Sequence, residues 1–218
     1  MRKVVILGTG GAASEVTFYI EDHNTKVDQQ NQITIVGYLD QNDDLWKKYD
    51  YSAPWLGSIE SYEPDSEVEI LIAIGNVSVR RKMINILLEK GLTIGSFIHE
   101  SVIMPKNLNI GVGNIVFPFC ILEKHANIGN YNFITSYSFI SHDCELGDNN
   151  FFSAAGIAGS VKVGNDNYFG IKSVVIPGKT IGNNNTVQAG MVVDKNVKDD
   201  TTIFYRYKEQ VLAIPKVN

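Results

Sequence analysis

The chain has 218 residues, 44% of them hydrophobic, so it can bury a sizeable core in one large domain or two small ones. Its net charge of -5 and pI near 5.4 disfavour a nucleic-acid partner, because phosphate backbones are bound by clustered Lys and Arg. No apolar run approaches the roughly 20 residues of a membrane helix. The first residues, MRKVVILGTGG, pass from charge into an apolar strand rather than into a signal peptide. We therefore expect a cytoplasmic protein without membrane insertion.

The first 96 residues have the pattern of a small α/β domain. Apolar runs typical of buried strands occur at residues 3–8, 33–40 and 69–76. Helix-forming segments follow the first and third of these runs, at residues 9–23 and 77–91. This order predicts a Rossmann-like domain with a small parallel sheet, ending near residue 96.

From residue 97 to 200 a different period replaces the helical one. An apolar residue recurs at every sixth position, with one residue skipped in the middle of the series. The fifteen positions are Ile110, Val116, Leu122, Ile128, Ile134, Ile140, Leu146, Phe152, Ile157, Val163, Phe169, Val175, Ile181, Val187 and Val193. Six residues make one short strand and a corner, and three such sides close a coil. The period therefore predicts a left-handed parallel β-helix, followed by a C-terminal tail at residues 201–218.

Glycine and asparagine recur once per coil. The glycines are Gly111, Gly129, Gly147, Gly164 and Gly182, and three residues after each stands an asparagine: Asn114, Asn132, Asn150, Asn167 and Asn185. Both residue types tolerate positive φ, so we expect them to form one corner of the prism.

One coil alone carries a histidine next to an aspartate, in the stretch FISHDCELGDNN at residues 139–150. His142 and Asp143 lie between the inward-pointing Ile140 and Leu146, so their side chains are expected at the surface. A carboxylate beside an imidazole favours its protonation and fixes its tautomer, which suits a general base. A surface pair without catalytic function is the alternative that the local sequence leaves open.

The remaining candidate residues are less distinctive. We expect His23 and His99 to be exposed structural residues, whereas His125 directly precedes a corner. Cys120 and Cys144 lack metal-ligand spacing and are too few for a disulfide framework, so both are expected to be reduced thiols. A nucleophilic Cys144 is the less favoured reading, because a buried cysteine is usually inert.

The first loop, GTGGAASEV, places Gly8, Gly10 and Gly11 between a strand and a helix. Glycines there let backbone N–H groups approach a phosphate at the helix start, although a tight turn without a ligand has the same pattern. Asp40 ends the second strand, where an acid can bind a ribose or a base edge. Asn76 and Arg80 follow the third strand and are further candidates for this pocket, with a solvated helix residue as the alternative for Arg80.

The glycine-rich strand-turn-helix, the β-helix, SHDC and the later VVIPGKTIG together resemble the bacterial nucleotide-sugar acetyltransferases, with sialic acid O-acetyltransferase-like proteins as close relatives. The resemblance covers nearly the whole chain. It implies a homotrimer that binds acetyl-coenzyme A in a groove between neighbouring β-helices, with His142 as base and Asp143 as its partner. It also implies that the loop binds the diphosphate of a UDP- or dTDP-linked sugar.

The chain departs from this family's pattern at two places. Many relatives carry a second histidine nine residues after the first, where this chain has Phe151, and another after the loop glycines, where it has Ala12. Both places are expected near the sugar, so Phe151 is a candidate substrate-binding residue.

For the coenzyme, the resemblance implies contacts to small residues and backbone in the later coils. Gly156, Gly159 and Gly190 are the candidates there. Lys179 and Lys195 are candidates for a coenzyme phosphate, with solvated surface lysines as the alternative.

The function implied is acetyl-coenzyme A-dependent N-acetylation of a nucleotide-linked 4-amino-4,6-dideoxy sugar, without a metal, in cell-surface polysaccharide biosynthesis. The alternative closest to it is O-acetylation of sialic acid or a related sugar hydroxyl. A metal-dependent hydratase of the same fold needs three histidines, whereas only His125 and His142 lie in the repeat. A non-catalytic sugar-binding or scaffold protein is disfavoured by the His-Asp pair.

Overall fold

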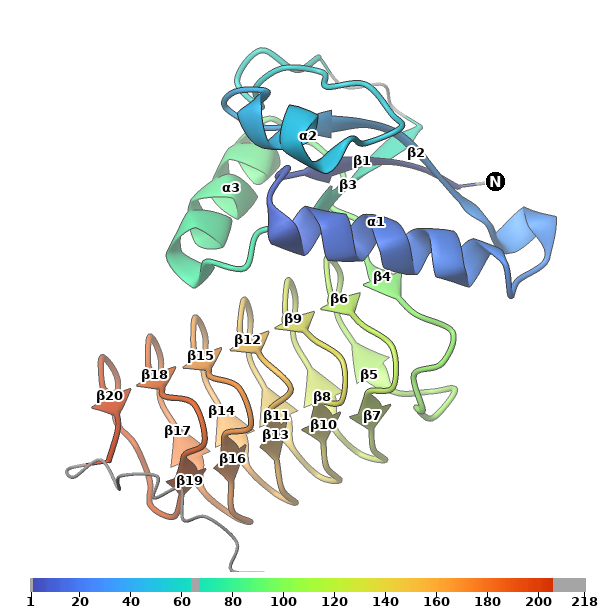
Figure 1. Ribbon diagram of the computed structural model, residues 1–218. Helices are drawn as coiled ribbons and strands as arrows, with labels where there is room; N and C mark the ends of the chain where they lie inside the picture. The colour runs from blue at the N-terminus through green and yellow to red at the C-terminus, as the bar shows by residue number, and fades with distance from the viewer. Residues whose placement is uncertain (1, 64–66, 206–218) are drawn as a thin grey trace, which may run out of the picture.

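A computed structural model describes residues 2–63 and 67–205, which form a small α/β domain seated on one face of a triangular prism (Figure 1). The α/β domain has a three-stranded parallel sheet in the order β2-β1-β3. Its strands are β1 (Arg2–Leu7), β2 (Ile33–Leu39) and β3 (Val68–Ile72), and its helices are α1 (Gly11–Asn24), η1 (Gln29–Asn31), α2 (Asp44–Tyr49) and α3 (Val77–Glu89). The predicted strands and the two predicted helices are confirmed, while η1 and α2 were not predicted.

The two faces of this sheet are covered differently. Val5 and Leu7 of β1 pack with Ile84 and Leu87 of α3 on one face. On the other face, β1 and α1 share a core with aromatic residues of the prism, among them Phe97, Phe117 and Phe133. This alternation follows from the period of two in a strand. The apolar core therefore crosses the domain boundary and fixes the α/β domain on the prism.

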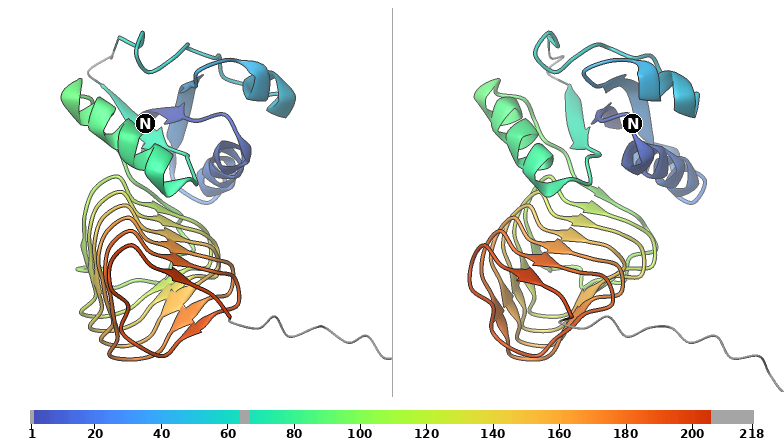
Figure 2. Two further views of the ribbon diagram at one scale, coloured as in Figure 1. Left: turned by 90° about the vertical axis from the view of Figure 1, so that its left-hand side faces the viewer. Right: turned by 60° about the vertical axis from the view of Figure 1, so that its left-hand side comes forward.

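The prism is a left-handed parallel β-helix built from strands of two residues each (Figure 2). Its first face, under the α/β domain, has the strands β4 (Phe97–Ile98), β6 (Ile115–Val116), β9 (Phe133–Ile134), β12 (Phe151–Phe152), β15 (Tyr168–Phe169), β18 (Thr186–Val187) and β20 (Thr202–Ile203). The second face has β7 (Ile121–Leu122), β10 (Phe139–Ile140), β13 (Gly156–Ile157), β16 (Val174–Val175) and β19 (Val192–Val193). The third face has β5 (Asn109–Ile110), β8 (Asn127–Ile128), β11 (Glu145–Leu146), β14 (Lys162–Val163) and β17 (Thr180–Ile181).

The hexapeptide prediction is confirmed in the prism interior. Every one of the periodic apolar positions lies in one continuous core, buried except for the partly buried Ile110 at the first coil. The boundary predicted for the tail was too early, because β20 pairs with β18 and so continues the first face. The rest of the predicted tail, from residue 206, lies outside the described residues.

The roles expected for the periodic glycines and asparagines at the corner were wrong. Positive φ occurs at Tyr131, Asn149 and Asp166, one residue before each periodic asparagine, and not at the asparagines themselves. The periodic asparagines are instead buried and form a ladder between coils. In it, the Asn150 backbone N–H donates to Asn132 Oδ1 over 2.8 Å, and the Asn167 N–H donates to Asn150 Oδ1 over 2.9 Å. The ladder supplies partners for backbone groups at a buried corner.

The periodic glycines are required for close approach rather than for positive φ. A Cβ on Gly147 would lie 2.5 Å from Asn165 Oδ1 and 2.7 Å from the Gly164 carbonyl oxygen of the next coil. That proximity lets the Asp148 N–H donate to Asn165 Oδ1 over 2.7 Å. In the stretch LGDNN, Gly147 allows the close contact between coils and Asp148 forms an outer hydrogen bond to the next coil. Asn149 has the positive φ of the corner, and Asn150 belongs to the inner asparagine ladder.

None of the helices within the described residues has the length and apolar character that a membrane span requires.

Candidate active site

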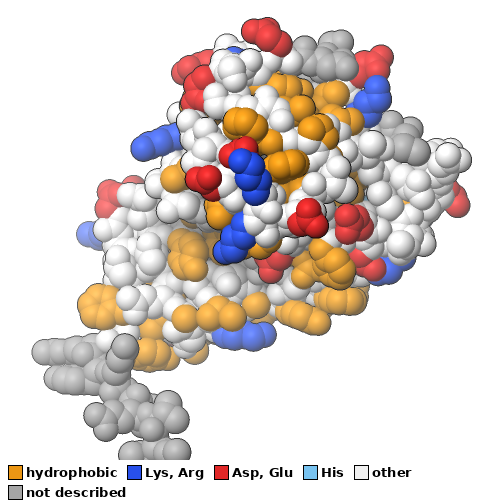
Figure 3. Space-filling model, turned by 45° about the horizontal axis from the view of Figure 1, so that its top comes forward, with side chains coloured by type: hydrophobic (Ala, Val, Ile, Leu, Met, Phe, Trp, Pro, Cys, Tyr) orange, Lys and Arg blue, Asp and Glu red, His pale blue; other side chains and the backbone are white. Residues whose placement is uncertain are grey.

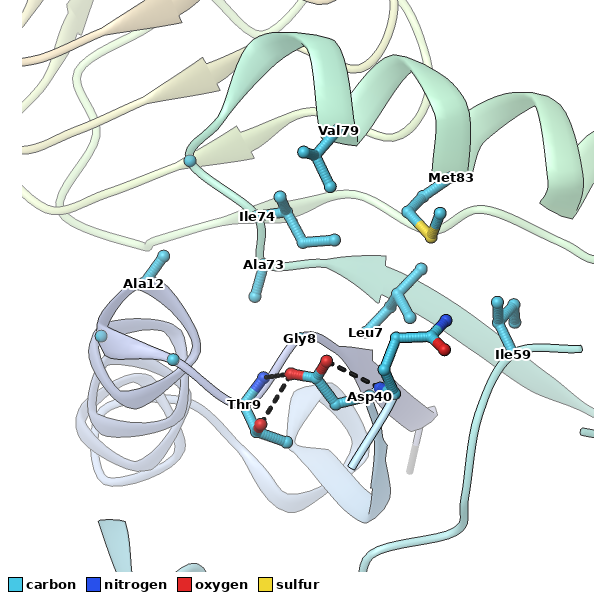
Figure 4. A pocket seen from close by; sticks show the side chains of 14 residues that line it. Leu7, Gly8, Thr9, Ala12, Asp40, Ile59, Ala73, Ile74, Val79 and Met83 are labelled. Atoms are coloured by element: carbon cyan, nitrogen blue, oxygen red, sulfur yellow. Dashed lines mark hydrogen bonds between the residues drawn. The ribbon is translucent and has the colours of Figure 1, made fainter. Parts of the chain in front are cut away.

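The first candidate site is a pocket of about 360 Å³ at the carboxyl ends of β1, β2 and β3. This edge of a parallel sheet is where open α/β folds bind ligands. Figure 4 shows Ile74, Val79 and Met83 across the pocket from Thr9 and Asp40. The predicted loop residues Gly8, Gly10 and Gly11 also line it, as do Ala12, Gln41, Ile59 and Gly75.

Asp40 holds the glycine loop from the side of β2. Its Oδ2 accepts hydrogen bonds from the Thr9 N–H over 2.9 Å and from the Thr9 hydroxyl over 2.7 Å, while Oδ1 accepts from the Gln41 N–H over 2.8 Å. A carboxylate offers about four acceptor sites, so Asp40 keeps capacity for a ligand donor. Its position in the pocket agrees with the prediction, and Thr9 and Gln41 are pocket residues that sequence reasoning missed.

Asn76 borders the domain junction but is engaged in capping α3. Its Oδ1 accepts from the Val79 N–H over 3.0 Å and from the Ser78 hydroxyl over 2.9 Å, which satisfies a free donor of the first helical turn. The same oxygen is therefore not free to bind a substrate donor.

The prediction that Arg80 lines the nucleotide pocket was wrong, and so was the alternative of a solvated helix residue. Arg80 is 1% exposed and points into the first face of the prism. Its guanidinium donates to Asn149 Oδ1 over 2.7 Å, to the Asn149 and Asn150 carbonyl oxygens over 3.1 Å each, and to the Ile74 carbonyl oxygen over 2.9 Å.

Arg80 therefore joins α3 to a corner of the prism. Burial lowers the pKa of this arginine to about 9, so the side chain still carries its charge at neutral pH. The sequence around Arg80 does not predict this role, because its neighbour Arg81 stands in the same helical segment and yet is partly exposed.

A second hollow, of about 790 Å³, lies between the start of α3 and the first face, and the two pockets share Gly75. Phe151 lines it and stacks on Tyr168 with ring centroids 5.3 Å apart and planes inclined by 3°. A Cβ on Gly75 would lie 3.5 Å from the Phe151 ring, so Phe151 lies against the residue that the two pockets share. Phe151 thus lies next to the first pocket and offers an aromatic surface there.

The second candidate site is the corner between the second and third faces, where His142 and Asp143 project. His142 Nδ1 and Asp143 Oδ2 are 2.8 Å apart, and the two side chains are 60% and 54% exposed. With Nδ1–H donating to the carboxylate, Nε2 carries the lone pair, and no described residue bonds to it. The surface position and the pairing both agree with the prediction.

The imidazole lies directly over Gly159 of the next coil. A Cβ on Gly159 would lie 2.6 Å from His142 Cε1 and 2.7 Å from Nε2, so a larger residue there would displace the ring from this position. The Gly159 N–H makes no hydrogen bond to any described residue, whereas the Ser160 N–H is engaged with the His142 carbonyl over 3.0 Å. A free donor therefore lies close to the free Nε2.

Glu123, one coil before His142, was missed by sequence reasoning. Its Oε2 accepts from the His142 backbone N–H over 2.9 Å. It also lines a shallow groove of about 530 Å³ beside the imidazole, whose other walls include Ile103, Met104 and Ile121. The spacing of one coil was a signal available in the sequence.

The predicted coenzyme residues fall at different places on the prism. Gly159 and Lys179 lie at the same corner as His142 in successive coils, where the Gly178 N–H donates to the Gly159 carbonyl over 3.0 Å. Gly156 belongs to the second face and is buried under the Phe139 ring, while Gly190 turns the corner between the first and second faces with φ of +73°. The structure thus brings together Gly159 and Lys179 but not the other two.

Both cysteines point into the prism. The thiol of Cys144 donates to the Ala158 carbonyl oxygen over 3.1 Å, and burial raises its pKa. Burial likewise raises the pKa of Cys120 to about 11. Neither thiol is poised as a nucleophile.

His99 is not exposed, contrary to expectation, and the His23 side chain is only 12% exposed. His99 Nε2 lies 2.9 Å from Asp22 Oδ2 and 3.0 Å from Glu100 Oε2. Ligand atoms of these three residues lie near enough to surround one cation, but the Lys26 ammonium is paired with both carboxylates. The Lys26 ammonium of the protein itself thus supplies positive charge beside the Asp22 and Glu100 carboxylates.

The two candidate sites lie on opposite sides of the prism. The pocket belongs to the domain on the first face, whereas His142 stands at the corner where the second and third faces meet, opposite the first (Figures 1 and 2). One chain therefore does not bring its own pocket and its own imidazole together.

Residues 3–87 match the family of the PglD N-terminal domain. No curated protein matches the chain. Similar solved structures include perosamine N-acetyltransferase from Caulobacter crescentus, a histidine-to-asparagine variant in complex with CoA and GDP-perosamine, at 23% identity, 93% coverage of each chain and a TM-score of 0.77.

Two others are the acetyltransferase domain of PglB from Neisseria gonorrhoeae FA1090 and WeeI from Acinetobacter baumannii AYE. The PglB domain is 21% identical with a TM-score of 0.78, and WeeI is 22% identical with a TM-score of 0.77. In each case 93% of this chain and 96% of the other are covered. The chain thus joins an α/β domain that matches the PglD N-terminal domain family to a left-handed parallel β-helix, and this is the fold it shares with these structures.

Proposed function

We propose that the protein is an acetyl-coenzyme A-dependent N-acetyltransferase acting on the amino group of a nucleotide-linked 4-amino-4,6-dideoxy sugar. The observation that carries this proposal is the imidazole of His142, whose Nδ1 is held by Asp143 over 2.8 Å. Its Nε2 and the nearby Gly159 N–H have no hydrogen-bond partner among the described residues. That arrangement offers a base and an oxyanion donor at one place.

The chemistry is a direct transfer. The sugar amine attacks the thioester carbonyl carbon as its proton passes to His142 Nε2, and the carbonyl oxygen gains the negative charge that the Gly159 N–H can stabilise. Collapse of the tetrahedral intermediate breaks the carbon–sulfur bond and releases the coenzyme thiolate, which takes up the proton. Asp143 keeps Nδ1 protonated and stabilises the imidazolium formed in between.

The pocket of the α/β domain supports a nucleotide diphosphate as the carrier of the sugar. It opens at the N-terminal end of α1, where the N–H groups of the first helical turn have no helical partners and attract phosphate. Gly8, Gly10 and Gly11 allow close approach, and Asp40 has acceptor capacity for a ribose or base. The perosamine N-acetyltransferase structure contains GDP-perosamine and CoA. For this chain we retain a UDP- or dTDP-linked sugar as the proposed substrate.

The coenzyme is proposed to lie along the corner that carries His142. Gly159 and Lys179 follow His142 at this corner in the next two coils, so an extended coenzyme molecule lying parallel to the prism axis passes both. The acetyltransferase domain of PglB has been solved with acetyl coenzyme A. No metal takes part in the proposed reaction.

A homotrimer is proposed as the working assembly. The pocket and the imidazole lie on opposite sides of one chain, so a complete site requires a second copy. The prism also exposes a row of hydrophobic side chains, seen along its lower part in Figure 3. Phe119, Tyr137 and Ile171 are 56%, 64% and 54% exposed, and surfaces of this kind mark contacts between proteins.

The proposed setting is the cytoplasm, where nucleotide sugars for cell-surface polysaccharides are modified. The decisive experiment incubates the purified protein with acetyl-coenzyme A and a panel of nucleotide-linked sugars, and measures release of the coenzyme thiol. Release with 4-amino sugars but not with the matching 4-hydroxy sugars is expected. Release with sialic acid or with hydroxyl acceptors alone would replace this proposal by O-acetylation, and no release with any acceptor would contradict both.

A further inference from the structure

A tyrosine that does not line the pocket forms hydrogen bonds to the backbone of the glycine loop. Tyr51 follows the end of α2 and is 8% exposed, and it does not line the pocket. Its hydroxyl donates to the Thr9 carbonyl oxygen over 3.1 Å and to the Gly10 carbonyl oxygen over 3.2 Å. One buried hydroxyl is thus shared between two consecutive carbonyls of the loop.

The ring that carries this hydroxyl is itself fixed. Tyr51 stacks on Tyr38 of β2 with ring centroids 4.2 Å apart and planes inclined by 25°. Tyr38 is fully buried, and its hydroxyl lies 2.8 Å from the Thr17 hydroxyl of α1. The stack therefore connects β2 to α1, the helix that follows the loop.

Asp40 and Tyr51 together bind the N–H, the hydroxyl and the carbonyl of Thr9. The Thr9 N–H and hydroxyl are held by Asp40, while the Thr9 carbonyl is held by Tyr51. With the carbonyls of Thr9 and Gly10 directed to the tyrosine, no described residue accepts from the N–H groups of Gly10 and Gly11, which border the pocket. A carbonyl turned toward a phosphate would repel it, whereas an N–H attracts it.

We propose that Tyr51 is a positioning residue for the nucleotide diphosphate: its hydroxyl holds the Thr9 carbonyl away from the pocket, and together with the Ser14 N–H it holds the Gly10 carbonyl, so that the loop N–H groups are presented to the anion. This inference rests on the proposed function, because it assumes that the loop binds a diphosphate. Removal of the hydroxyl leaves the Thr9 carbonyl without a donor among the described residues, which favours rotation of that peptide, whereas the Gly10 carbonyl keeps the Ser14 N–H at 3.1 Å.

The test compares Tyr51→Phe with Tyr38→Phe, two variants that each lose one hydroxyl from the same stack. Titration calorimetry with UDP, dTDP and GDP, and separately with coenzyme A, is run on the full chain. For whichever diphosphate the wild type binds, Tyr51→Phe is expected to raise the dissociation constant about 5- to 30-fold. Coenzyme binding should stay within about twofold, as should every constant of Tyr38→Phe.

In steady state, the same pattern is a rise in KM for the nucleotide sugar with kcat nearly unchanged. If Tyr51→Phe proves too unstable for calorimetry, hydrogen exchange of residues 9–13 in the wild type takes its place. Addition of the diphosphate should then slow exchange of the loop amides.

The possible outcomes distinguish a failure of the proposed function from a failure of the inference about Tyr51. A wild type that binds coenzyme A but none of the diphosphates would overturn the proposed function and this inference together. A Tyr51→Phe variant that binds a diphosphate as tightly as the wild type does would overturn the inference alone, as would an equal loss in Tyr38→Phe. Unchanged exchange of the loop amides would show that the diphosphate does not bind at this loop, and would overturn both.

Discussion

At the scale of single residues, the proposed reaction depends on the free Nε2 of His142. We expect His142→Ala to lower kcat by about 10²- to 10⁴-fold, which is the usual contribution of a general base. Folding should be intact because the side chain is 60% exposed. Steady-state thiol release with circular dichroism on the same sample measures both quantities.

Cys144→Ala is the matched control in the same coil. Its thiol points into the prism, so this variant should keep kcat within a few-fold and show sequential kinetics. A His142→Ala enzyme with near-normal turnover would exclude histidine as the base. Ping-pong kinetics together with an inactive Cys144→Ala would instead indicate a thioester intermediate.

Asp40 tests the nucleotide pocket. Asp40→Ala should raise KM for the nucleotide sugar about 10- to 100-fold, which corresponds to roughly 1.5 to 3 kcal/mol for a lost charge-assisted hydrogen bond. The affinity for the coenzyme should change little, because the pocket and the His142 corner are separate. Asp43→Ala, which removes a carboxylate paired with Lys47 outside the pocket, is the control. Equal losses for both substrates would show that the α/β domain is not the nucleotide-sugar domain.

At the scale of elements, Arg80 couples α3 to the prism. Arg80→Met should lower the free energy of unfolding by about 3 to 5 kcal/mol, because three carbonyls and one amide oxygen at a buried interface lose their donor. Chemical denaturation measures the loss. Arg81→Met removes the neighbouring partly exposed pair with Asp166 and should cost at most about 1 kcal/mol. Similar losses in the two variants would mean that Arg80 is not the coupling residue.

The close contact between coils at Gly147 gives a second prediction at this scale. Gly147→Ala should destabilise the protein by about 1 to 3 kcal/mol, because the added Cβ would overlap backbone atoms of the next coil. Glu145→Ala changes an exposed side chain of the same coil and should alter stability by no more than about 0.5 kcal/mol. Thermal unfolding of both proteins decides the matter, and an unaffected Gly147→Ala would refute the close-approach explanation of the repeat.

At the scale of the whole molecule, the opposite placement of pocket and imidazole predicts sites shared between copies. Light scattering should give about three times the chain mass of 24.2 kDa. Refolding His142→Ala together with Asp40→Ala should restore part of the activity at low nucleotide-sugar concentration, because some mixed interfaces then carry both intact residues. A monomer under assay conditions, or mixtures no more active than the separate variants, would contradict the shared site.

Much of the architecture could be predicted from the sequence because the β-helix depends on a regular repeat of apolar residues. The apolar residue at every sixth position places one inward side chain on each short strand, and all of these positions lie in one core. The strands and helices around the glycine loop and the exposed His142–Asp143 pair were likewise predictable, since each depends on neighbours within a few residues.

Contacts between coils and between domains were decided by the tertiary structure alone. The periodic asparagines were correctly noticed, but their ladder became evident only when coils were stacked 17 or 18 residues apart. Arg80, His99 and Tyr51 have ordinary local sequences, and what they do depends on groups brought to them from distant segments. The physical reason is that burial and hydrogen-bond partners are properties of packed surfaces, whereas a one-dimensional pattern records only which way each side chain turns from its own backbone.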